Sequence, residues 1–307
     1  MRKALAAVAA LAACGGGSSQ GPIDAPNDDF PDAFVEFPDA GLIWEPLISR
    51  SWSLQPMGEE WECTRMQVTS DTWIAGFREL APAGTDELVL TVSSTATPLG
   101  DYDCSAASVD TTMIYAAGIR TDDLVFPTAA AVHVSAGQYL NLNVHLSQLG
   151  TSTLTGTSGV LVATTDPSLI AHPVDMFFAG TVVISIPSND MPKTQQGGCS
   201  AGSDYHIVSL WPHMHALGTH QQLVVGDPST GTSTTLLDAD YSVSSQVNHP
   251  VADTDVAISD TITTTCTWVN DTGTTVVAGD TVASEQCFTG IYEYSIPGSM
   301  YSCVTGI

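Results

Sequence analysis

The sequence predicts an all-β protein built from antiparallel sandwiches or barrels. Three observations predict this class: short runs of alternating residues rich in β-branched side chains recur along the chain, clusters of Gly, Pro, Asp and Ser separate them, and helical periodicity is hard to find. Many short strands between turn signals are typical of such folds. The chain has 307 residues, which is enough for two domains of ordinary size.

Six runs carry the strand pattern. They are residues 87–92, 139–145, 159–163, 181–186, 258–268 and 274–277. Residues 166–173 hold two prolines and no strand pattern, which favours a boundary between two domains at this point. We therefore expect an N-terminal domain at residues 45–172 and a C-terminal domain at residues 173–307.

The start of the chain resembles a bacterial lipoprotein signal. A short basic start is followed by an apolar run that is too short to span a bilayer, and small residues precede Cys14. Residues 1–14 are thus expected to be the signal, with the Cys14 thiol as the lipid acceptor. Residues 15–44 are rich in Gly, Pro, Asp and Ser and are expected to form a flexible tether. This predicts an exported protein of the cell envelope that meets the membrane only through its lipid anchor.

The charge balance excludes two classes of partner. There are 7 Lys and Arg residues against 33 Asp and Glu residues, which gives a net charge of -26. Nucleic-acid binding needs a basic footprint, which this chain lacks. Attraction to anionic lipid head groups is excluded for the same reason.

Six cysteines remain after Cys14, and an even number in an exported chain predicts disulfide bridges. No pair has the C-x-x-C spacing of a zinc or redox motif, and six cysteines allow fifteen pairings. Two of them precede residue 150 and four follow it, which is consistent with bridges inside each domain. The six are Cys63, Cys104, Cys199, Cys266, Cys287 and Cys303.

The sharpest local motif is a pair of histidines, His213 and His215, with Gly218 and His220 soon after. Two residues at i and i+2 of a strand point to the same face, so both imidazoles can hold one metal ion. Neutral imidazole suits copper, zinc and iron. A histidine-rich surface strand without a ligand role is the other interpretation of this motif.

The segments that follow make the motif more specific. Residues 265–270 read Thr-Cys-Thr-Trp-Val-Asn, and residues 284–288 read Ser-Glu-Gln-Cys-Phe. Together with His-x-His-x-x-Gly, they resemble the C-terminal domain of the copper type II, ascorbate-dependent monooxygenases, the relatives of peptidylglycine α-hydroxylating and dopamine β-monooxygenases. The N-terminal half is similar more loosely, through Trp61-Glu-Cys63 and the segment 142–145, Leu-Asn-Val-His. The resemblance implies two tandem antiparallel β-sandwich domains, jelly-roll-like in type.

The resemblance also implies a ligand set. In that family one copper is held by two His and one Met, and by motif these positions are His213, His215 and Gln286. The other copper uses an adjacent His-His pair, which reads Glu87-Leu88 here, and a distant His, which corresponds to His145. His220 lies close enough in sequence to be a replacement third ligand. We therefore expect at most one copper per chain, with ascorbate or another external reductant if the protein is catalytic.

The resemblance extends to the disulfides. It implies a Cys199–Cys303 bridge that ties the ends of the C-terminal domain and a Cys266–Cys287 bridge beside the ligand position 286. Cys63 and Cys104 then pair inside the N-terminal domain.

Three functions are compatible with these features. The first is O2-dependent C–H hydroxylation of a small molecule or peptide by an exported, monomeric copper protein. The alternative is a catalytically impaired metal- or ligand-binding surface lipoprotein that keeps the fold but not the two-copper chemistry. The third is a purely structural lipoprotein. No residue is assigned a catalytic role from the sequence.

Overall fold

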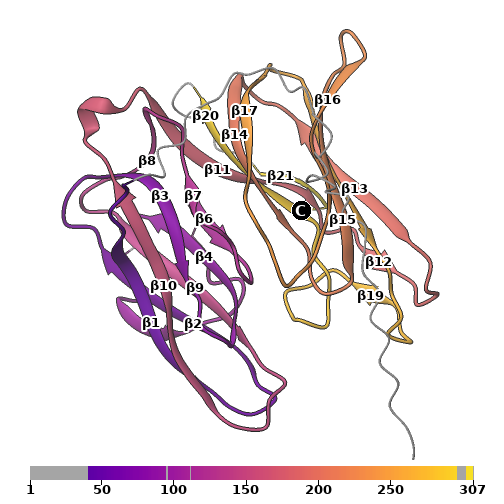
Figure 1. Ribbon diagram of the computed structural model, residues 1–307, viewed down its shortest axis with the longest axis horizontal. Helices are drawn as coiled ribbons and strands as arrows, with labels where there is room; N and C mark the ends of the chain where they lie inside the picture. Colours follow the sequence, from indigo (N-terminus) through magenta and orange to yellow (C-terminus); the bar gives the residue numbers. More distant parts are fainter. Residues whose placement is uncertain (1–40, 95, 111, 296–301, 307) are drawn as a thin grey trace, which may run out of the picture. The chain divides into compact units, whose positions relative to one another are not determined.

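The computed structural model describes residues 41–94, 96–110, 112–295 and 302–306. Within them the regular secondary structure is β-strand apart from one short 3-10 helix at Pro167–Leu169, so the all-β prediction is confirmed (Figure 1). The predicted signal at residues 1–14, its Cys14 and the first part of the predicted tether lie outside the described residues. Among those that are described, no helix is long and apolar enough to cross a membrane.

The strands before residue 165 form two layers. One is a five-stranded sheet in the order β5-β2-β9-β4-β6, and the other is the β1-β10-β3-β8 part of a larger sheet, from which β7 pairs with β3 (Figure 1). The strands are β1 (Glu45–Leu54), β2 (Glu59–Gln67), β3 (Thr72–Leu80), β4 (Thr85–Ser93), β5 (Gly100–Asp103), β6 (Thr112–Ala117), β7 (Leu124–Val125), β8 (Ala130–Val134), β9 (Tyr139–Ser147) and β10 (Leu154–Thr164).

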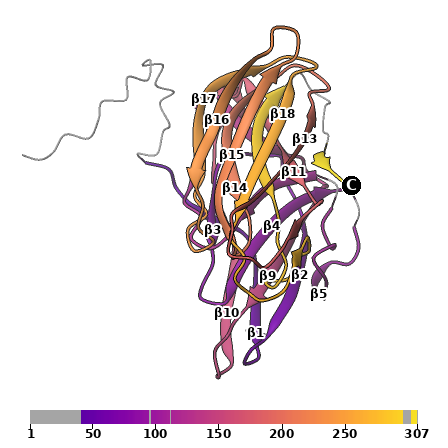
Figure 2. The ribbon, with the colours of Figure 1, turned by 90° about the vertical axis from the view of Figure 1, so that its right-hand side faces the viewer.

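Most of the later strands form two layers of the same kind, and β12 pairs with β19 in a separate two-stranded sheet. A four-stranded sheet, β13-β18-β15-β16, packs against β11-β20-β14-β17 of the larger sheet (Figure 2). The strands are β11 (His172–Thr181), β12 (Ser185–Ile186), β13 (Lys193–Ser200), β14 (Tyr205–His213), β15 (Gly218–Asp227), β16 (Thr232–Asp240), β17 (His249–Val256), β18 (Thr261–Trp268), β19 (Val276–Val277), β20 (Phe288–Ser295) and β21 (Cys303–Thr305).

Strand β9 has one apolar face that packs in a core and one polar face that carries His145. Leu140, Leu142, Val144 and Leu146 alternate on one face and are fully buried in the first apolar core. The intervening polar residues face the other way, as the period of two in a strand requires. They are buried as well, and His145 is among them. The polar face of this sheet is therefore covered, and its polar groups need partners.

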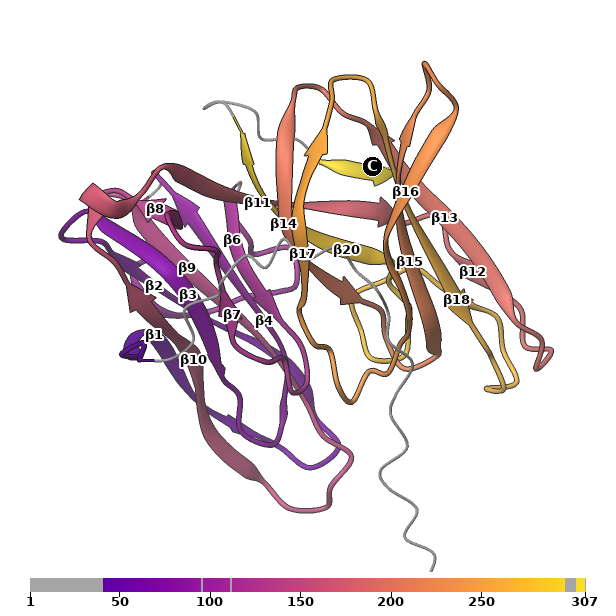
Figure 3. The same cartoon turned by 45° about the horizontal axis from the view of Figure 1, so that its top comes forward.

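The larger sheet has ten strands and runs through both halves of the chain. Its continuity comes from a parallel pairing of β8 with β11, where His172 lies opposite Ala130 and Pro173 opposite Ala131 (Figure 3). Trp211 and Tyr292, from later strands, belong to the same buried cluster as Phe126. The division into domains at residues 45–172 and 173–307 therefore stays a prediction, because its boundary falls inside a shared sheet.

The three predicted disulfides are present with the predicted pairing: Cys63–Cys104, Cys199–Cys303 and Cys266–Cys287. The Cys199–Cys303 bridge joins β13 to the short strand β21. The Cys266–Cys287 bridge joins β18 to the residue just before β20, next to position 286.

The prediction of a single strand at residues 181–186 is wrong. Strand β11 ends at Thr181, and β12 begins only at Ser185. The hydroxyl of Thr181 accepts a hydrogen bond from the backbone N–H of Val183 at 2.9 Å, which turns the chain out of the sheet. The β-branched residues of this segment thus predict one continuous strand, but the hydrogen bond accepted by the Thr181 hydroxyl ends it.

Two acidic residues face each other across β11 and β20, which are neighbouring strands of the ten-stranded sheet. Glu293 on β20 lies opposite Asp175 on β11, and Glu293 is only 2% exposed. Burial, together with the charge of Asp175, raises the pKa of Glu293 to about 8. A carboxylic acid whose pKa is higher in the folded than in the unfolded state stabilises the folded state at pH values below the unfolded pKa. This contribution to the free energy of unfolding is lost as the pH rises through the folded pKa.

We therefore expect Glu293→Gln, which mimics the protonated acid, to raise the free energy of unfolding at pH 8 by about 1–3 kcal/mol and to change it little near pH 4.5. Urea denaturation at the two pH values measures this. Glu60→Gln, at an exposed position of β2, is the matched control. An equal effect of Glu293→Gln at both pH values would contradict the prediction.

Candidate metal centre

The two histidines of the motif lie at the end of a strand and in the turn that follows. His213 is the last residue of β14, and His215 lies two residues beyond it, so the expectation that both belong to one strand is wrong. Their rings are nevertheless close, with centroids 5.5 Å apart and planes at 86°. Both side chains are buried, with exposures of 3% and 5%.

Close packing of the chain around position 218 explains why the motif has a glycine there. A Cβ atom at this position would lie 2.8 Å from the Cβ of Met214 and 2.9 Å from the ring of Tyr241. Met214 is fully buried, as expected for a residue that points away from the two histidines, and its carbonyl accepts a hydrogen bond from the Tyr241 hydroxyl. Only glycine lets the turn fold back onto Met214, so His-x-His-x-x-Gly is a structural unit.

Hydrogen bonds set the tautomer of both rings. Nδ1 of His215 donates to the carbonyl oxygen of Ser284 at 2.9 Å, because a carbonyl only accepts. Nδ1 of His213 lies 2.8 Å from Oε1 of Gln246, whose Nε2 is used as a donor to Val243. Each Nδ1 therefore carries the proton and each Nε2 keeps its lone pair, the usual arrangement for metal-binding histidines.

A carboxylate completes the cluster. Glu87, His213 and His215 each offer one ligand atom, and these three atoms lie within 4.8 Å of one another. Glu87 comes from β4 of the five-stranded sheet. Metal–ligand bonds are about 2.0–2.2 Å, so small side-chain adjustments would bring the three atoms onto one ion. This was the one such group of His, Cys, Asp and Glu found among the described residues.

Local strand geometry aims Glu87 at the histidines. The register between β4 and β9 shifts between Thr85 and Glu87, so Asp86 is an extra residue in the ladder and Glu87 faces His145. Such a bulge redirects side chains, and bulges are common beside functional sites. Both Asp86 and Glu87 thus lie near His145, and Glu87 also lies near His213 and His215.

His145 is held between two carboxylates. Its Nδ1 lies 3.1 Å from Asp86, its Nε2 lies 3.0 Å from Glu59, and its ring stacks on Trp61 with centroids 4.5 Å apart. Burial alone would lower the pKa of His145, but the hydrogen bond and charge of Asp86, with Glu87 and Glu59, outweigh it and raise the pKa. A histidine whose two nitrogens both face carboxylates is a proton-bearing group rather than a metal ligand.

Burial shapes the protonation of the cluster itself. Burial lowers the pKa of His213, which favours the neutral imidazole that binds metals. Burial raises the pKa of Glu87, although the nearby His215 and His145 reduce this effect. A bound cation would supply the positive charge that this half-buried carboxylate lacks.

The cluster has the features of a metal site. Nε2 of His213 is buried and makes no hydrogen bond of normal geometry, although the Gln286 side chain lies near it, so a ligand that binds this nitrogen would remove the cost of burying it. Two imidazole nitrogens and one carboxylate are a common donor set for divalent transition metals. The described residues therefore fit one metal ion.

A small cavity of about 70 Å³ opens beside Glu87. Its lining includes Trp61, Asn143, His145, Asp280 and Gln286. The Gln286 amide donates to the Gly279 carbonyl and to Asp280, and the residue is close enough to His213 to influence its pKa. Gln286, expected from the resemblance as a ligand, thus lies at the edge of the cluster.

His220, the other candidate for the third ligand, lies outside the cluster. It belongs to β15, where its Nε2 pairs with Asp238 of β16 at 2.9 Å, and its side chain is 36% exposed. The third candidate ligand is instead Glu87. From the sequence, this position was noted only because the family has a histidine there. In the sequence, the feature that could have indicated Glu87 is the pair of adjacent carboxylates, Asp86 and Glu87, directly before the apolar run at residues 88–90.

Comparisons with known proteins identify no family for this chain. No family model matches the chain, and no curated protein matches it. Among solved structures, the chain is similar to "Structure of infectious bursal disease virus Gx strain", with 10% identity over 84% of this chain and 74% of that chain and a TM-score of 0.21. The infectious bursal disease virus VP2 subviral particle has 10% identity, covers 84% and 73%, and has a TM-score of 0.18. Similarities this weak carry no argument.

Proposed function

We propose that the chain is an exported metalloprotein that holds one divalent transition-metal ion through Glu87, His213 and His215. The observation that carries the proposal is the convergence of two Nδ1-protonated imidazoles and one carboxylate within 4.8 Å. The net charge of -26 adds long-range attraction for cations.

Copper(II) is the metal we propose. Among divalent ions of the first transition row, Cu²⁺ binds nitrogen and oxygen donors most tightly, and the sequence motifs resemble those of copper proteins. A carboxylate is a harder ligand than the thioether of the family pattern, so this set should favour Cu(II) over Cu(I). Gln286 lies beside His213 and is the candidate for a further weak ligand.

The reaction we propose from the resemblance is O2-dependent C–H hydroxylation of a small molecule or peptide. The bound copper would supply redox chemistry, with electrons from ascorbate or another external reductant. The chain's own residues supply the surroundings: Trp61 covers one face of His145, and Asp86 and Glu59 hold a proton on its ring beside the cavity.

A second candidate is metal binding without oxygenation. One group of ligands is found among the described residues, and the family's first His-His pair reads Glu87-Leu88. His145, its remaining histidine, is occupied by Asp86 and Glu59. Without a second copper, a protein that keeps the fold and one metal would serve as a metal- or ligand-binding surface lipoprotein.

The cellular setting is proposed from the sequence. Cys14 would carry the lipid and anchor a monomeric protein in the cell envelope, with residues 15–44 as its tether. The acidic composition gives no basis for nucleic-acid binding.

Copper loading tests the proposal. We expect the purified chain to retain one equivalent of Cu(II) after desalting, measured by atomic absorption. Ascorbate-dependent oxygen consumption by the loaded protein would support hydroxylation, and its absence would support the binding protein. No retained copper would contradict both.

A further inference from the structure

The turn that carries His215 is held by one neighbouring loop. The carboxylate of Glu285 accepts the backbone N–H of His215 at 3.0 Å and the backbone N–H of Leu217 at 2.7 Å. The carbonyl oxygen of the preceding residue, Ser284, accepts Nδ1–H of the His215 ring at 2.9 Å. Two consecutive residues therefore fix both the backbone and the ring of one candidate ligand.

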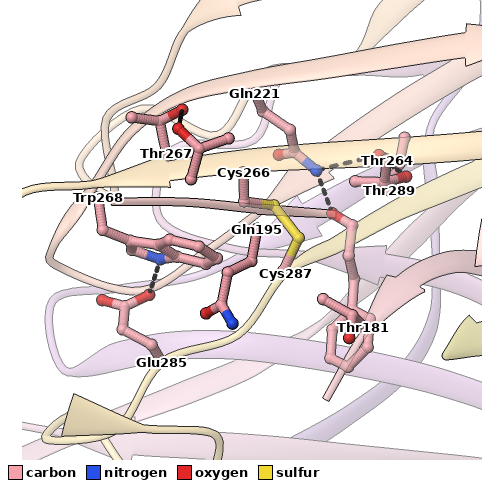
Figure 4. Close-up of a disulfide and its surroundings, with 12 residues drawn as sticks. Thr181, Gln195, Gln221, Thr264, Cys266, Thr267, Trp268, Glu285, Cys287 and Thr289 are labelled. Carbon is pink, nitrogen blue, oxygen red and sulfur yellow. Dashed lines mark hydrogen bonds between the residues drawn. A yellow bond between two sulfur atoms is a disulfide. The ribbon is translucent and has the colours of Figure 1, made fainter. Parts of the chain in front are cut away.

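Glu285 is placed deep in the protein to do this. It is 1% exposed, and its Oε2 also accepts the indole N–H of Trp268 at 2.9 Å (Figure 4). Three donors thus satisfy a carboxylate that would be costly to bury without them. Its hydrogen bonds reach the turn at residues 213–217 and Trp268, and its negative charge also lies close enough to His215 to interact with that side chain.

The loop itself is anchored on both sides of Glu285. Its backbone pairs with the end of β19 and the residues that follow: the N–H of Glu285 donates to the Val277 carbonyl at 3.1 Å, and the Glu285 carbonyl accepts from the N–H of Gly279 at 3.2 Å. Two residues further on, Cys287 is bound to Cys266 of β18 (Figure 4). A rigid loop can therefore impose its geometry on the turn, as supporting partners of metal ligands do.

We propose that Glu285 is a positioning residue for the metal centre, which sets the direction in which Nε2 of His215 points. The inference rests on the proposed function, because it assigns the turn a ligand to orient. Without the carboxylate, the N–H groups of His215 and Leu217 lose their acceptor, and the loosened turn holds the ring against Ser284 only part of the time, so the Nδ1–H bond that fixes the tautomer is weakened. The turn then samples several orientations, and the three ligand atoms no longer converge.

Glu285→Gln tests this with the smallest change in shape. An amide offers one acceptor oxygen and places an NH2 group where a second acceptor is needed, so the three donors cannot all be satisfied. Trp268→Phe is the matched control: it removes a hydrogen bond to the same carboxylate and lowers stability, but leaves both bonds to the turn in place. The readouts are Cu(II) affinity by competition titration, the tautomer of His215 by 15N NMR in the metal-free protein, and thermal unfolding.

We expect Cu(II) affinity to fall by about 10–100-fold in Glu285→Gln, the usual cost of losing an outer partner of a metal ligand. The Nδ1–H tautomer of His215 should give way to a mixture in the same variant. Trp268→Phe should unfold at a lower temperature yet keep the wild-type affinity within a few-fold and the wild-type tautomer.

Two results would overturn the inference while leaving the proposed function intact. The first is wild-type affinity in Glu285→Gln, and the second is an equal loss of affinity in Trp268→Phe, which would show a general structural role. If the wild-type chain binds no copper, the proposed function fails. The tautomer measurement then decides the positioning role alone, and an unchanged His215 tautomer in Glu285→Gln would overturn it.

Discussion

Replacing His213 by alanine should lower the affinity for Cu(II) by about 100-fold or more, because a direct ligand is worth more than the outer partners whose loss already costs about 10–100-fold. The substitution removes one of three converging donors and leaves Gln246 without its imidazole partner. Competition titration of the purified variant measures the change, and circular dichroism checks that the β-sheet signal is retained.

His220→Ala is the control for this substitution. It removes a histidine from the same sequence motif, but one that pairs with Asp238 away from the cluster. Its Cu(II) affinity should equal that of the wild type. Undiminished binding in His213→Ala, or an equal loss in both variants, would mean that the cluster is not the binding site.

Removing the Cys199–Cys303 bridge should produce the largest loss of stability. The two cysteines are 104 residues apart, and the bridge secures β21, which has only three residues and pairs in parallel with β11. Native bridges of exported domains typically contribute about 2–5 kcal/mol, and the contribution of a bridge rises with the length of the loop that it closes. We expect Cys199→Ala/Cys303→Ala to lower the free energy of unfolding by about 2–5 kcal/mol.

Urea denaturation of this variant and of Cys266→Ala/Cys287→Ala provides the comparison. The second bridge joins residues only 21 apart, so chain entropy predicts a loss that is smaller by about 1.4 kcal/mol. Wild-type stability in the Cys199→Ala/Cys303→Ala variant would show that non-covalent packing alone holds the C-terminal strand in place.

Much of the fold follows from local patterns. The alternation at residues 87–92 and 139–145 predicted strands that became β4 and β9, since one face of each strand had to be apolar. The break after Thr181 was not predictable in this way, because it depends on a single hydroxyl bond to Val183. The pairing of β8 with β11 joins the two halves of the ten-stranded sheet through backbone bonds, which leave no pattern in the side chains.

The candidate site was only partly readable from the sequence. His213 and His215 stand in a compact motif, and Gly218 marks the close turn that follows. Glu87 reaches them from a distant strand, through a bulge at Asp86 and the packing of separate sheets, none of which local spacing encodes. Glu285 was within a recognised motif, but its role depends on backbone N–H groups that every residue has.

The central claim is a single metal centre with two histidine ligands and one carboxylate. Pulsed electron paramagnetic resonance of the chain loaded with Cu(II) tests it most directly, because the protonated Nδ1 of each bound imidazole modulates the echo and can be counted. We expect one equivalent of bound Cu(II) with two such imidazoles, falling to one in His215→Ala and staying at two in Glu87→Ala with altered copper parameters. Two tightly bound equivalents, or a third imidazole in the wild-type spectrum, would contradict it.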